Sequence, residues 1–418
     1  MSKVNNTHYV LTIYSLLKRG IIIEKKAAIR RQIDDSLTYT NIIILTVISI
    51  FLPYIFAGII LVGLGIYLVI NKQTRKIIFA QKYSKYIFWF FVFYLIEALL
   101  YGNWFGVGAG FGLILAVFIG LFQRSFMTRE LYERVLTLVC LLSVTSSSCA
   151  ISQKYVISLL DDFYSYNRIS AMFLHPNYFG TITATVIIVC AYKIFTNQGP
   201  KWLYYIIGIL NVVSIYLCES MFAWIEVFVG ISVLLIVLKK WRIFWVWVFA
   251  AILAVFIIFA LNIDLIPRLS DAGETIRLRL KIWNFVVEEI KKSPLLGHGS
   301  MSCAFLSSKS DNLIPHSHSI YLDSLLNYGI IGAIIMLVCF AKYLYSVLSI
   351  CFKEKQTTVT SLILAISAAA LVHGITDLTL FWLQTLPLFI FILSGIGTFE
   401  NREEKRLFNL LIRQRYAE

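Results

Sequence analysis

Long apolar segments recur along almost the whole chain, and they constrain its fold more than any other feature. Segments close to the length that crosses a lipid bilayer, about 20 residues, follow one another from Asn41 to Gly397. Hydrophobic residues make up 59% of the 418 residues and charged residues only 14%, whereas soluble globular proteins average about a quarter charged. The sequence therefore predicts an all-α, polytopic integral membrane protein.

About twelve transmembrane helices are expected, within a domain covering residues 41–400. The thirty apolar residues Asn41–Ile70 are too many for one upright helix, and Pro53 is a suitable break between two short ones. Ten further spans are expected at Tyr86–Gly102, Val107–Phe122, Val135–Ser152, Tyr178–Phe195, Trp202–Leu217, Met221–Leu238, Ile243–Asn262, Tyr321–Cys351, Val359–Leu378 and Phe381–Gly397.

Basic residues orient these spans, because Lys and Arg gather in cytoplasmic segments. Strongly basic flanks precede and follow Asn41–Ile70, so both termini are expected in the cytoplasm, which places 28 of the 37 Lys and Arg residues there. Residues 1–40 lack a signal peptide's long apolar region and are expected to form an amphipathic segment on the inner leaflet. Residues 401–418 are expected to be a basic cytoplasmic tail. Membrane anchoring explains the formal net charge of +14, so no nucleic-acid partner is expected.

One extracytoplasmic loop, residues 263–320, is the main exception to the apolar pattern. The segment Ile263–Leu322 carries seven Lys or Arg, six Asp or Glu and three His. Within it, apolar residues recur every three or four positions over Glu274–Lys292, which predicts an amphipathic helix. A polar block of this size between membrane spans is where chemistry or recognition is expected.

Two groups of arginines are candidates for anion binding. Arg277 and Arg279 lie near the start of the amphipathic helix, where positive charge is unfavourable unless an anion is bound. Arg168 lies just before a turn at Pro176. The alternatives are a solvated helix face for the first group and, for Arg168, a side chain that reaches the lipid headgroups.

Five of the six histidines lie in or beside the predicted outer loops, and His8 is expected in the cytoplasm. His316 and His318 precede the next span, and His373 lies near the end of another. A neutral imidazole accepts a proton near pH 7, which suits a general base that activates a hydroxyl group. No metal is expected, because no further ligand at helical spacing accompanies the pair and the seven cysteines are scattered.

Several motifs resemble those of the O-antigen ligase and O-antigen polymerase superfamily of bacterial envelope enzymes. The similar stretches are Arg279–Trp283, Ser293–Gly299, His318–Leu322, Tyr328–Gly332, the pair Arg168 and His175–Asn177, and His373–Asp377. Two positions differ from the family pattern: Ser319 stands where Asn is usual, and Cys218–Ser220 stands where the family often has Ser-Arg-Gly.

The resemblance implies a glycosyltransferase in the bacterial inner membrane, with its active site on the extracytoplasmic face. Its donor would be an oligosaccharide carried on undecaprenyl diphosphate, with no cofactor and no metal. Arg168 and Arg279 would bind the diphosphate, and His318 would be the catalytic base of an inverting reaction. His316, His373, Asp377 and Arg277 would have supporting roles.

The resemblance leaves the acceptor open. A polymerase that builds O-antigen or capsule-type polysaccharide uses another lipid-linked glycan, whereas a ligase uses lipid A core. Polymerase is the first expectation, because no dedicated core-binding domain is visible, and a chain-length regulator is a possible partner. A flippase for the same glycan and a catalytically silent membrane scaffold are the alternatives from other classes. Against a transporter, the charged residues that lie more than three residues from an end of a predicted span are Glu97, Glu226 and Lys342, and no internal repeat is evident.

Overall fold

The computed structural model describes residues 38–159, 168–260, 272–309, 313–378 and 381–399. The chain divides into two units, Thr46–Thr398 and a second made of Met1–Leu45 with Phe399–Glu418. Most of the predicted amphipathic segment 1–40, all of the predicted tail 401–418 and residues 261–271 of the long loop lie outside the described residues. The candidate site lies within the unit Thr46–Thr398.

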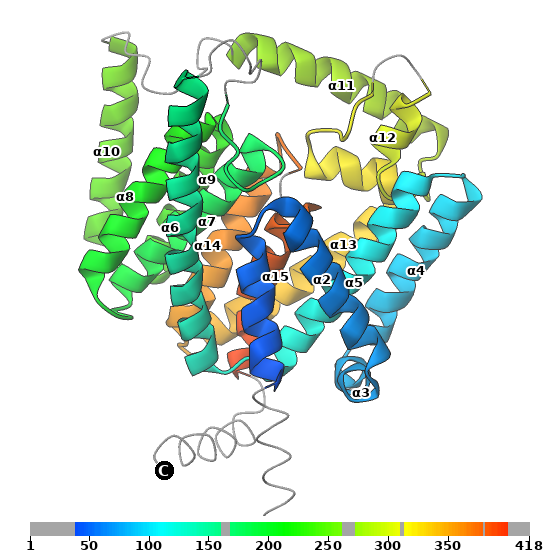
Figure 1. The fold of residues 1–418 in the computed structure, drawn as a ribbon, viewed down its shortest axis with the longest axis horizontal. Coiled ribbons are helices and arrows are strands. Elements are labelled where there is room, and N and C mark those ends of the chain that lie inside the picture. The colour runs from blue at the N-terminus through cyan, green and yellow to red at the C-terminus, as the bar shows by residue number, and fades with distance from the viewer. Residues whose placement is uncertain (1–37, 160–167, 261–271, 310–312, 379–380, 400–418) are drawn as a thin grey trace, which may run out of the picture. The chain divides into compact units, whose positions relative to one another are not determined.

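The described residues of this unit form helices and no β-strands (Figure 1). The helices are α2 (Tyr54–Ile70), α3 (Lys72–Ala80), α4 (Ser84–Leu100), α5 (Trp104–Phe126), α6 (Arg129–Leu159), α7 (Pro176–Phe195), α8 (Lys201–Cys218), α9 (Met221–Val237), α10 (Trp241–Ala260), α11 (Ala272–Lys292), α12 (Ser302–Ser307), α13 (Ile320–Phe352), α14 (Thr357–His373) and α15 (Thr385–Ser394).

Six of these helices are long and apolar enough to cross a membrane: α5, α6, α7, α8, α10 and α13. The pair α2 and α3, bent by 84°, adds a seventh if it is one span. Among the described helices, α9, α14 and α15 are apolar but shorter. The polytopic all-helical class is therefore confirmed, whereas the count of twelve spans stays a prediction.

The predicted break at Pro53 is present. One helix covers Thr38–Ile50, and α2 begins directly after Pro53. The Gln384 side-chain amide donates hydrogen bonds to the carbonyls of Ile50 (2.9 Å) and Leu52 (2.8 Å). These bonds satisfy carbonyl groups that the interrupted helix leaves without an intrahelical partner.

Helix α7 is the most buried of the candidate spans, because 83% of its most apolar 18-residue segment is buried. It packs against α8 and α9, and α9 packs against α14. Its start is well defined, because Pro176 occupies the first helical turn and the His175 side chain accepts a hydrogen bond from the Asn177 backbone N–H. The residues at this end of α7 are therefore held in fixed positions.

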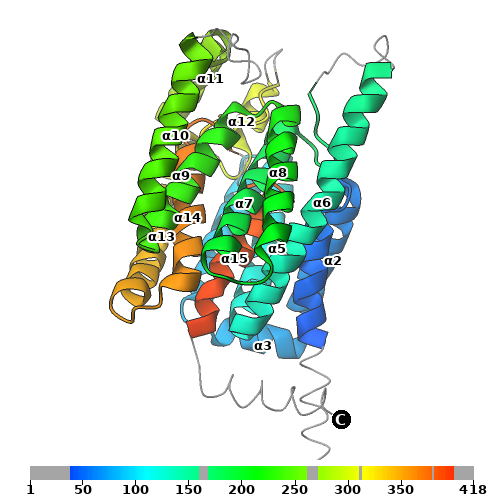
Figure 2. The same ribbon diagram turned by 90° about the vertical axis from the view of Figure 1, so that its left-hand side faces the viewer.

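The amphipathic helix expected over Glu274–Lys292 is α11. Figure 1 shows α11 lying across the ends of other helices, and Figures 1 and 2 place α11 and α12 at the end opposite to α3. The buried residue Val286 anchors α11 in a small apolar cluster with Cys303 and Leu326. The predicted loop thus carries a packed helix at one end of the unit.

The turn that follows α11 is bound to a break in α13. Gly329 has φ 60° and ψ −174° inside α13, a conformation that only glycine adopts readily. The amides of Ile330 and Ile331 donate to the carbonyls of Pro294 and Leu295, at 2.8 and 3.1 Å. The motifs Ser293–Gly299 and Tyr328–Gly332 therefore meet as a structural pair, which holds the first part of α13. The histidine loop, residues 313–319, ends where α13 begins.

Candidate active site

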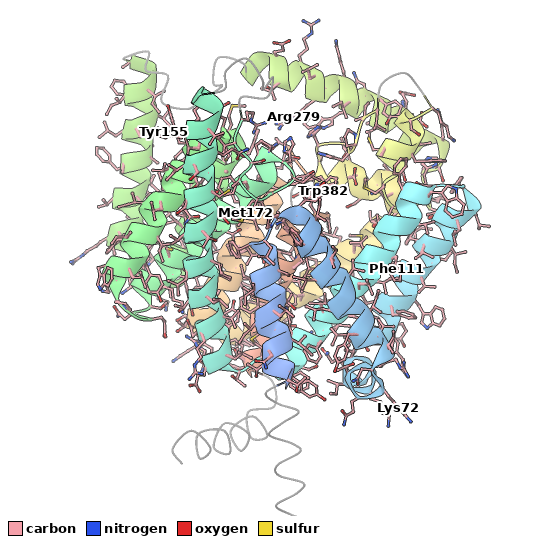
Figure 3. All side chains as sticks on the ribbon, in the orientation of Figure 1. Lys72, Phe111, Tyr155, Met172, Arg279 and Trp382 are labelled. Atoms are coloured by element: carbon pink, nitrogen blue, oxygen red, sulfur yellow. The ribbon has the colours of Figure 1, made fainter. Side chains whose placement is uncertain are left out.

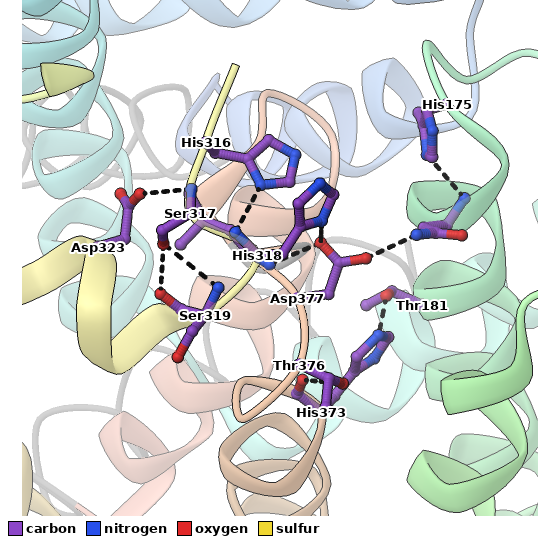
Figure 4. Close-up of polar contacts among 12 residues, drawn as sticks. His175, Thr181, His316, Ser317, His318, Ser319, Asp323, His373, Thr376 and Asp377 are labelled. Atoms are coloured by element: carbon purple, nitrogen blue, oxygen red, sulfur yellow. Dashed lines mark hydrogen bonds and ion pairs between the residues drawn. The ribbon is translucent and has the colours of Figure 1, made fainter. Parts of the chain in front are cut away.

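His318 and Asp377 face each other at the centre of the candidate site (Figure 4). The two atoms closest to each other are His318 Nδ1 and Asp377 Oδ1, 3.4 Å apart. His318 lies in the loop before α13 with φ 53°, a left-handed conformation that is uncommon outside glycine. Asp377 lies in the turn after α14. Two loops distant in the sequence therefore place an imidazole beside a carboxylate.

Asp377 is buried and held by several donors. Its Oδ1 accepts from the Leu378 backbone N–H at 2.7 Å, and its Oδ2 accepts from the Asn177 side-chain amide at 2.6 Å. Burial alone would raise the pKa of this carboxyl, but the contact with His318 and the charges of the neighbouring imidazoles outweigh it, so the pKa is lowered. The group is therefore an ionised carboxylate at neutral pH.

Asn177 connects Asp377 to Arg168. Arg168 Nη2 donates to Asn177 Oδ1 at 2.6 Å, so the amide of Asn177 accepts from a cation and donates to an anion. Both contacts agree with one orientation of the amide group. Sequence reasoning named Asn177 only as part of a turn motif and gave it no role, although the His-Pro-Asn motif was the available signal.

Arg168 also binds the end of α8. Its Nε and Nη2 donate to the Cys218 carbonyl at 3.2 and 3.1 Å, and Nη2 reaches the Glu219 carbonyl at 3.3 Å. These carbonyls belong to the last turn of a helix, where an arginine is electrostatically favourable. Cys218–Ser220, the turn that differs from the family pattern, thus contacts Arg168 through backbone carbonyls.

Arg279 reaches the same region from α11. Its guanidinium lies over the Phe222 ring, 5.0 Å from the centroid, and Figure 3 shows the side chain beneath α11. A small cavity of about 30 Å³ is lined by Arg279 and by Asn177, Asp377, His373, Thr275 and the start of α9, Glu219–Phe222. Arg277, by contrast, is exposed. The structure therefore brings Arg279 to the network of Arg168, Asn177, Asp377 and His318.

His316 packs directly on His318. The two ring centroids are 4.2 Å apart, and His316 Nδ1 accepts a hydrogen bond of 3.3 Å from the His318 backbone N–H. Burial, followed by the neighbouring His318, lowers the pKa of His316 to about 4. The imidazole is therefore neutral at physiological pH and acts as a hydrogen-bond acceptor that shapes the loop.

The histidine loop has two further supports. The Trp283 indole N–H of α11 donates to the Ser317 carbonyl at 3.0 Å, and Asp323 Oδ1 accepts from the Ser317 N–H at 3.2 Å. Ser319 is the N-cap of α13 and accepts from the Leu322 N–H. Asn and Ser are both favourable N-caps, which explains why Ser319 replaces the usual Asn without loss of the helix start.

His373 forms a separate buried pair with Glu226. His373 Nδ1 and Glu226 Oε2 are 2.7 Å apart, and both side chains are only 3% exposed. The Thr181 hydroxyl also approaches His373 Nδ1, at 3.5 Å (Figure 4). The pair joins α9 to α14 just before the turn that carries Asp377. It therefore helps to hold that turn in place. Glu226 received no site role from the sequence.

His316, His318 and Asp377 also have the geometry of a possible metal site. One ligand atom from each lies within 4.8 Å of the others. Three protein ligands are the number found in catalytic zinc sites. Asp377 supplies the third ligand that the sequence pattern did not place near the pair, so the expectation of metal-independent chemistry stays a prediction.

A comparison with known families gives a match that overlaps this site. Residues 206–337 match the family model of O-antigen ligase. This segment of the chain is similar to O-antigen ligase. The match confirms the predicted resemblance to the O-antigen ligase and polymerase superfamily, and it implies a glycosyltransferase-like membrane enzyme. A search of curated proteins gives no match.

The matched segment covers only part of the candidate site. It includes Arg279, His316 and His318, whereas Arg168, Asn177 and the His373–Asp377 turn lie outside the matched residues. The apolar helices, together with this match, indicate a multi-pass membrane protein. The matched family implies two classes of substrate, a lipid-linked glycan and an acceptor.

Proposed function

We propose that this protein is an inverting polysaccharide polymerase that transfers a glycan from undecaprenyl diphosphate to a sugar hydroxyl of a second lipid-linked glycan. The observation that carries the proposal is the meeting of His318, Asp377 and Arg279 from three distant segments at one end of the helical unit. A reaction that needs a base on one side and stabilisation of a leaving anion on the other fits this arrangement.

The donor diphosphate is proposed to bind beside Arg279. The cavity under this residue is also lined by Ser220–Phe222 and Asn177, at the starts of α9 and α7, and helix N-termini favour anions. At about 30 Å³ the cavity accommodates one or two phosphate oxygens, not a whole diphosphate. The remaining phosphate oxygens would face outward toward the acceptor.

Arg168 remains a candidate diphosphate ligand, but its contacts favour a second role. Its donors are directed at Asn177 and at the carbonyls that end α8. We infer that Arg168 holds Asn177 in place, and Asn177 in turn holds Asp377. Loss of Arg168 would then reduce turnover by misplacing the carboxylate as well as by removing positive charge.

His318 is the proposed base. With Nδ1 directed at Asp377, its Nε2 accepts the proton of the acceptor hydroxyl, as the deprotonating oxygen attacks the anomeric carbon. The bond from that carbon to the diphosphate breaks, and its electron pair leaves with the lipid diphosphate. Asp377 stabilises the imidazolium that forms, and the attack from the opposite side inverts the anomeric configuration.

Reconstituted enzyme in vesicles with a lipid-linked oligosaccharide tests the proposal. His318→Ala should lower glycan transfer by about 10²- to 10⁴-fold, to a residual rate that a single-turnover assay measures, while leaving the amount of folded protein unchanged. Arg279→Lys should lower turnover by about 10²- to 10³-fold, because a point charge cannot replace a guanidinium fork. Arg277→Lys, on the same helix but exposed, is the matched control and should retain activity. Normal transfer by His318→Ala would refute the assignment.

Chelation tests the absence of a metal. Activity that survives exhaustive EDTA treatment supports direct base catalysis by His318. Activity that is lost and returns only with a divalent cation would instead make His316, His318 and Asp377 metal ligands.

A ligase is the second candidate, because the matched family is described as O-antigen ligase. The two functions differ in the acceptor alone, so lipid A core and a second lipid-linked glycan should be offered in parallel. Elongation of the lipid-linked glycan would support a polymerase, and attachment to lipid A core would support a ligase.

A further inference from the structure

His318 Nδ1, the atom that faces Asp377, is buried and lacks a hydrogen-bond partner among the described residues. The Asp377 Oδ1 atom is 3.4 Å from it, whereas N–H···O hydrogen bonds are typically about 2.7 to 3.2 Å long. A buried polar atom without a partner is uncommon, because its loss of hydration is not compensated. The position is therefore suited to a ligand that takes the lone pair of this nitrogen.

His316, His318 and Asp377 each place one ligand atom at this position (Figure 4). These three atoms lie within 4.8 Å of one another. In a tetrahedral zinc site, with bonds of about 2.0 to 2.2 Å, neighbouring ligand atoms are about 3.3 to 3.6 Å apart. The separation of His318 Nδ1 and Asp377 Oδ1, 3.4 Å, already falls in this range. A small approach of His316 would complete three of the four zinc ligands.

The ligands are supported by further groups of the site. Asp377 Oδ2 accepts from the Asn177 side chain at 2.6 Å, and Oδ1 accepts from the Leu378 N–H at 2.7 Å. Hydrogen bonds of this kind orient the ligands of metal sites. His316 Nδ1 accepts only a long hydrogen bond, 3.3 Å from the His318 backbone nitrogen, so this atom gives up little when it binds an ion. The arrangement thus has both the ligands and the supporting groups of a metal site.

The chemistry and surroundings of the ligands select the kind of ion. Two imidazoles and one carboxylate favour Zn²⁺ over Mg²⁺, which prefers oxygen ligands. The His318 side chain is 27% exposed, so an ion can reach the ligands from the surface. The guanidinium of Arg279 acts electrostatically on His316, and a positive charge there weakens the binding of a dication. The site therefore fits a reversibly bound zinc ion better than a permanently bound one.

We propose that His316, His318 and Asp377 bind a Zn²⁺ ion that reversibly inhibits the protein. With Nδ1 of His318 bound to the ion, the single proton of the neutral imidazole lies on Nε2. This is the atom that the proposed reaction uses to accept the proton of the acceptor hydroxyl, so the base is blocked. The inhibitory effect rests on the proposed function, whereas the binding of zinc does not.

Calorimetric titration with ZnCl₂ measures binding to purified protein that has been treated with a chelator and then freed of it. Wild type should bind a single ion, and Mg²⁺ should not bind at this site. His316→Asn should weaken zinc binding by at least about tenfold, because an amide is a poor zinc ligand although its oxygen can still accept from the His318 N–H. Cys339→Ser, which removes an exposed thiol elsewhere, is the control and should bind zinc as wild type does. Equal zinc binding by wild type and His316→Asn, or no binding by wild type, would overturn the proposal.

Glycan transfer at increasing zinc concentration tests the inhibition. Wild-type transfer should fall as the site fills and return when EDTA is added, and Mg²⁺ at the same concentration should not reproduce the effect. Each variant is compared with its own rate without zinc, so a change in basal activity does not enter the comparison. His316→Asn should need at least about tenfold more zinc than wild type for half-inhibition. The same zinc sensitivity in both proteins, or faster transfer with zinc, would contradict the inhibitory site.

Binding and transfer are measured on the same preparations, so that the zinc site and the proposed reaction fail separately. If metal-free wild type transfers no glycan, the proposed reaction fails, and the calorimetric comparison of wild type with His316→Asn still decides the zinc site. If transfer proceeds without metal and zinc does not bind, only the zinc site fails.

Discussion

Asn177 connects opposite charges in the site through one side-chain amide group. It accepts from Arg168 and donates to Asp377, each at 2.6 Å. Hydrogen bonds to charged groups are worth about 1.5 to 3 kcal/mol each in net stability. The arrangement therefore orients the carboxylate that faces His318.

Asn177→Ala should reduce turnover by about tenfold or more, because it misplaces Asp377, and the Michaelis constant for the donor should change less, because Arg279 is still present to bind the diphosphate. Steady-state transfer assays measure both constants. Asn284→Ala, at an exposed position on α11, is the control and should behave as wild type. A rise in the Michaelis constant alone would mean that Asn177 binds substrate instead.

His316 gives the protein a pH-dependent stability. Its pKa is about 4 when folded, against an ordinary value of 6.5, so the unfolded chain binds a proton between these values and the folded protein does not. The free energy of unfolding should therefore fall as the pH drops from about 6.5 to about 4, by roughly 3 kcal/mol in total.

Thermal unfolding of the detergent-solubilised protein at several pH values measures this effect. His316→Asn should lose this part of the pH dependence while keeping the rest. If its unfolding temperature drops between pH 6.5 and pH 4 as much as that of wild type, His316 is not the responsible group.

At the scale of elements, the loop after α11 and the break in α13 depend on each other. The Gly329 conformation directs the backbone amides that follow it to the carbonyls of Pro294 and Leu295. These hydrogen bonds hold the turn after α11 against the first part of α13. Trp283 then connects α11 to the histidine loop through the Ser317 carbonyl. Arg279 and His318 are positioned by this one assembly.

Gly329→Ala should therefore destabilise the protein by on the order of 3 kcal/mol. The added Cβ would lie 2.3 Å from the Leu295 carbonyl oxygen, in a conformation that disfavours any side chain. Thermal unfolding checks the loss, with Gly273→Ala as the control because its Cβ would meet open space. Equal unfolding temperatures for the two variants would show that the break in α13 tolerates a side chain.

The sequence predicted the elements well because their signals are local. Apolar runs, the break at Pro53 and the periodicity of α11 each depend on neighbouring residues. Arg279 and His318 were proposed as site residues because they lie in motifs. The pairing of Asn177 with Asp377 spans 200 residues and depends on how α7 packs near α14, so no local pattern contains it.

Arg168 and the pair of Glu226 and His373 show the same limit of sequence-based prediction. The role of Arg168 in binding the carbonyls at the end of α8 follows from packing, as does the buried pair of Glu226 and His373. Both were visible in the sequence only as charged residues in unusual places. Their partners could not be read from it, because the contacts join helices that are far apart in the chain.

At the scale of the whole molecule, the basic helix α3 and the helix α11, which carries Arg279, lie at opposite ends of the unit Thr46–Thr398 (Figures 1 and 2). The proposed topology places α3 in the cytoplasm and α11 outside. A membrane-impermeant maleimide applied to intact cells should therefore label Lys281→Cys, on α11. Lys76→Cys, on α3, should react only after permeabilisation, and unsubstituted protein gives the background. The reverse pattern would contradict the orientation and an extracytoplasmic site.

The central claim is that His318 and Asp377 act as one catalytic unit, and a double-mutant cycle in single-turnover glycan transfer tests it most directly. Residues that act together have non-additive effects. The account predicts that Asp377→Asn combined with His318→Ala is no slower than His318→Ala alone. Rate losses that multiply, or transfer at the wild-type rate by His318→Ala, would contradict it.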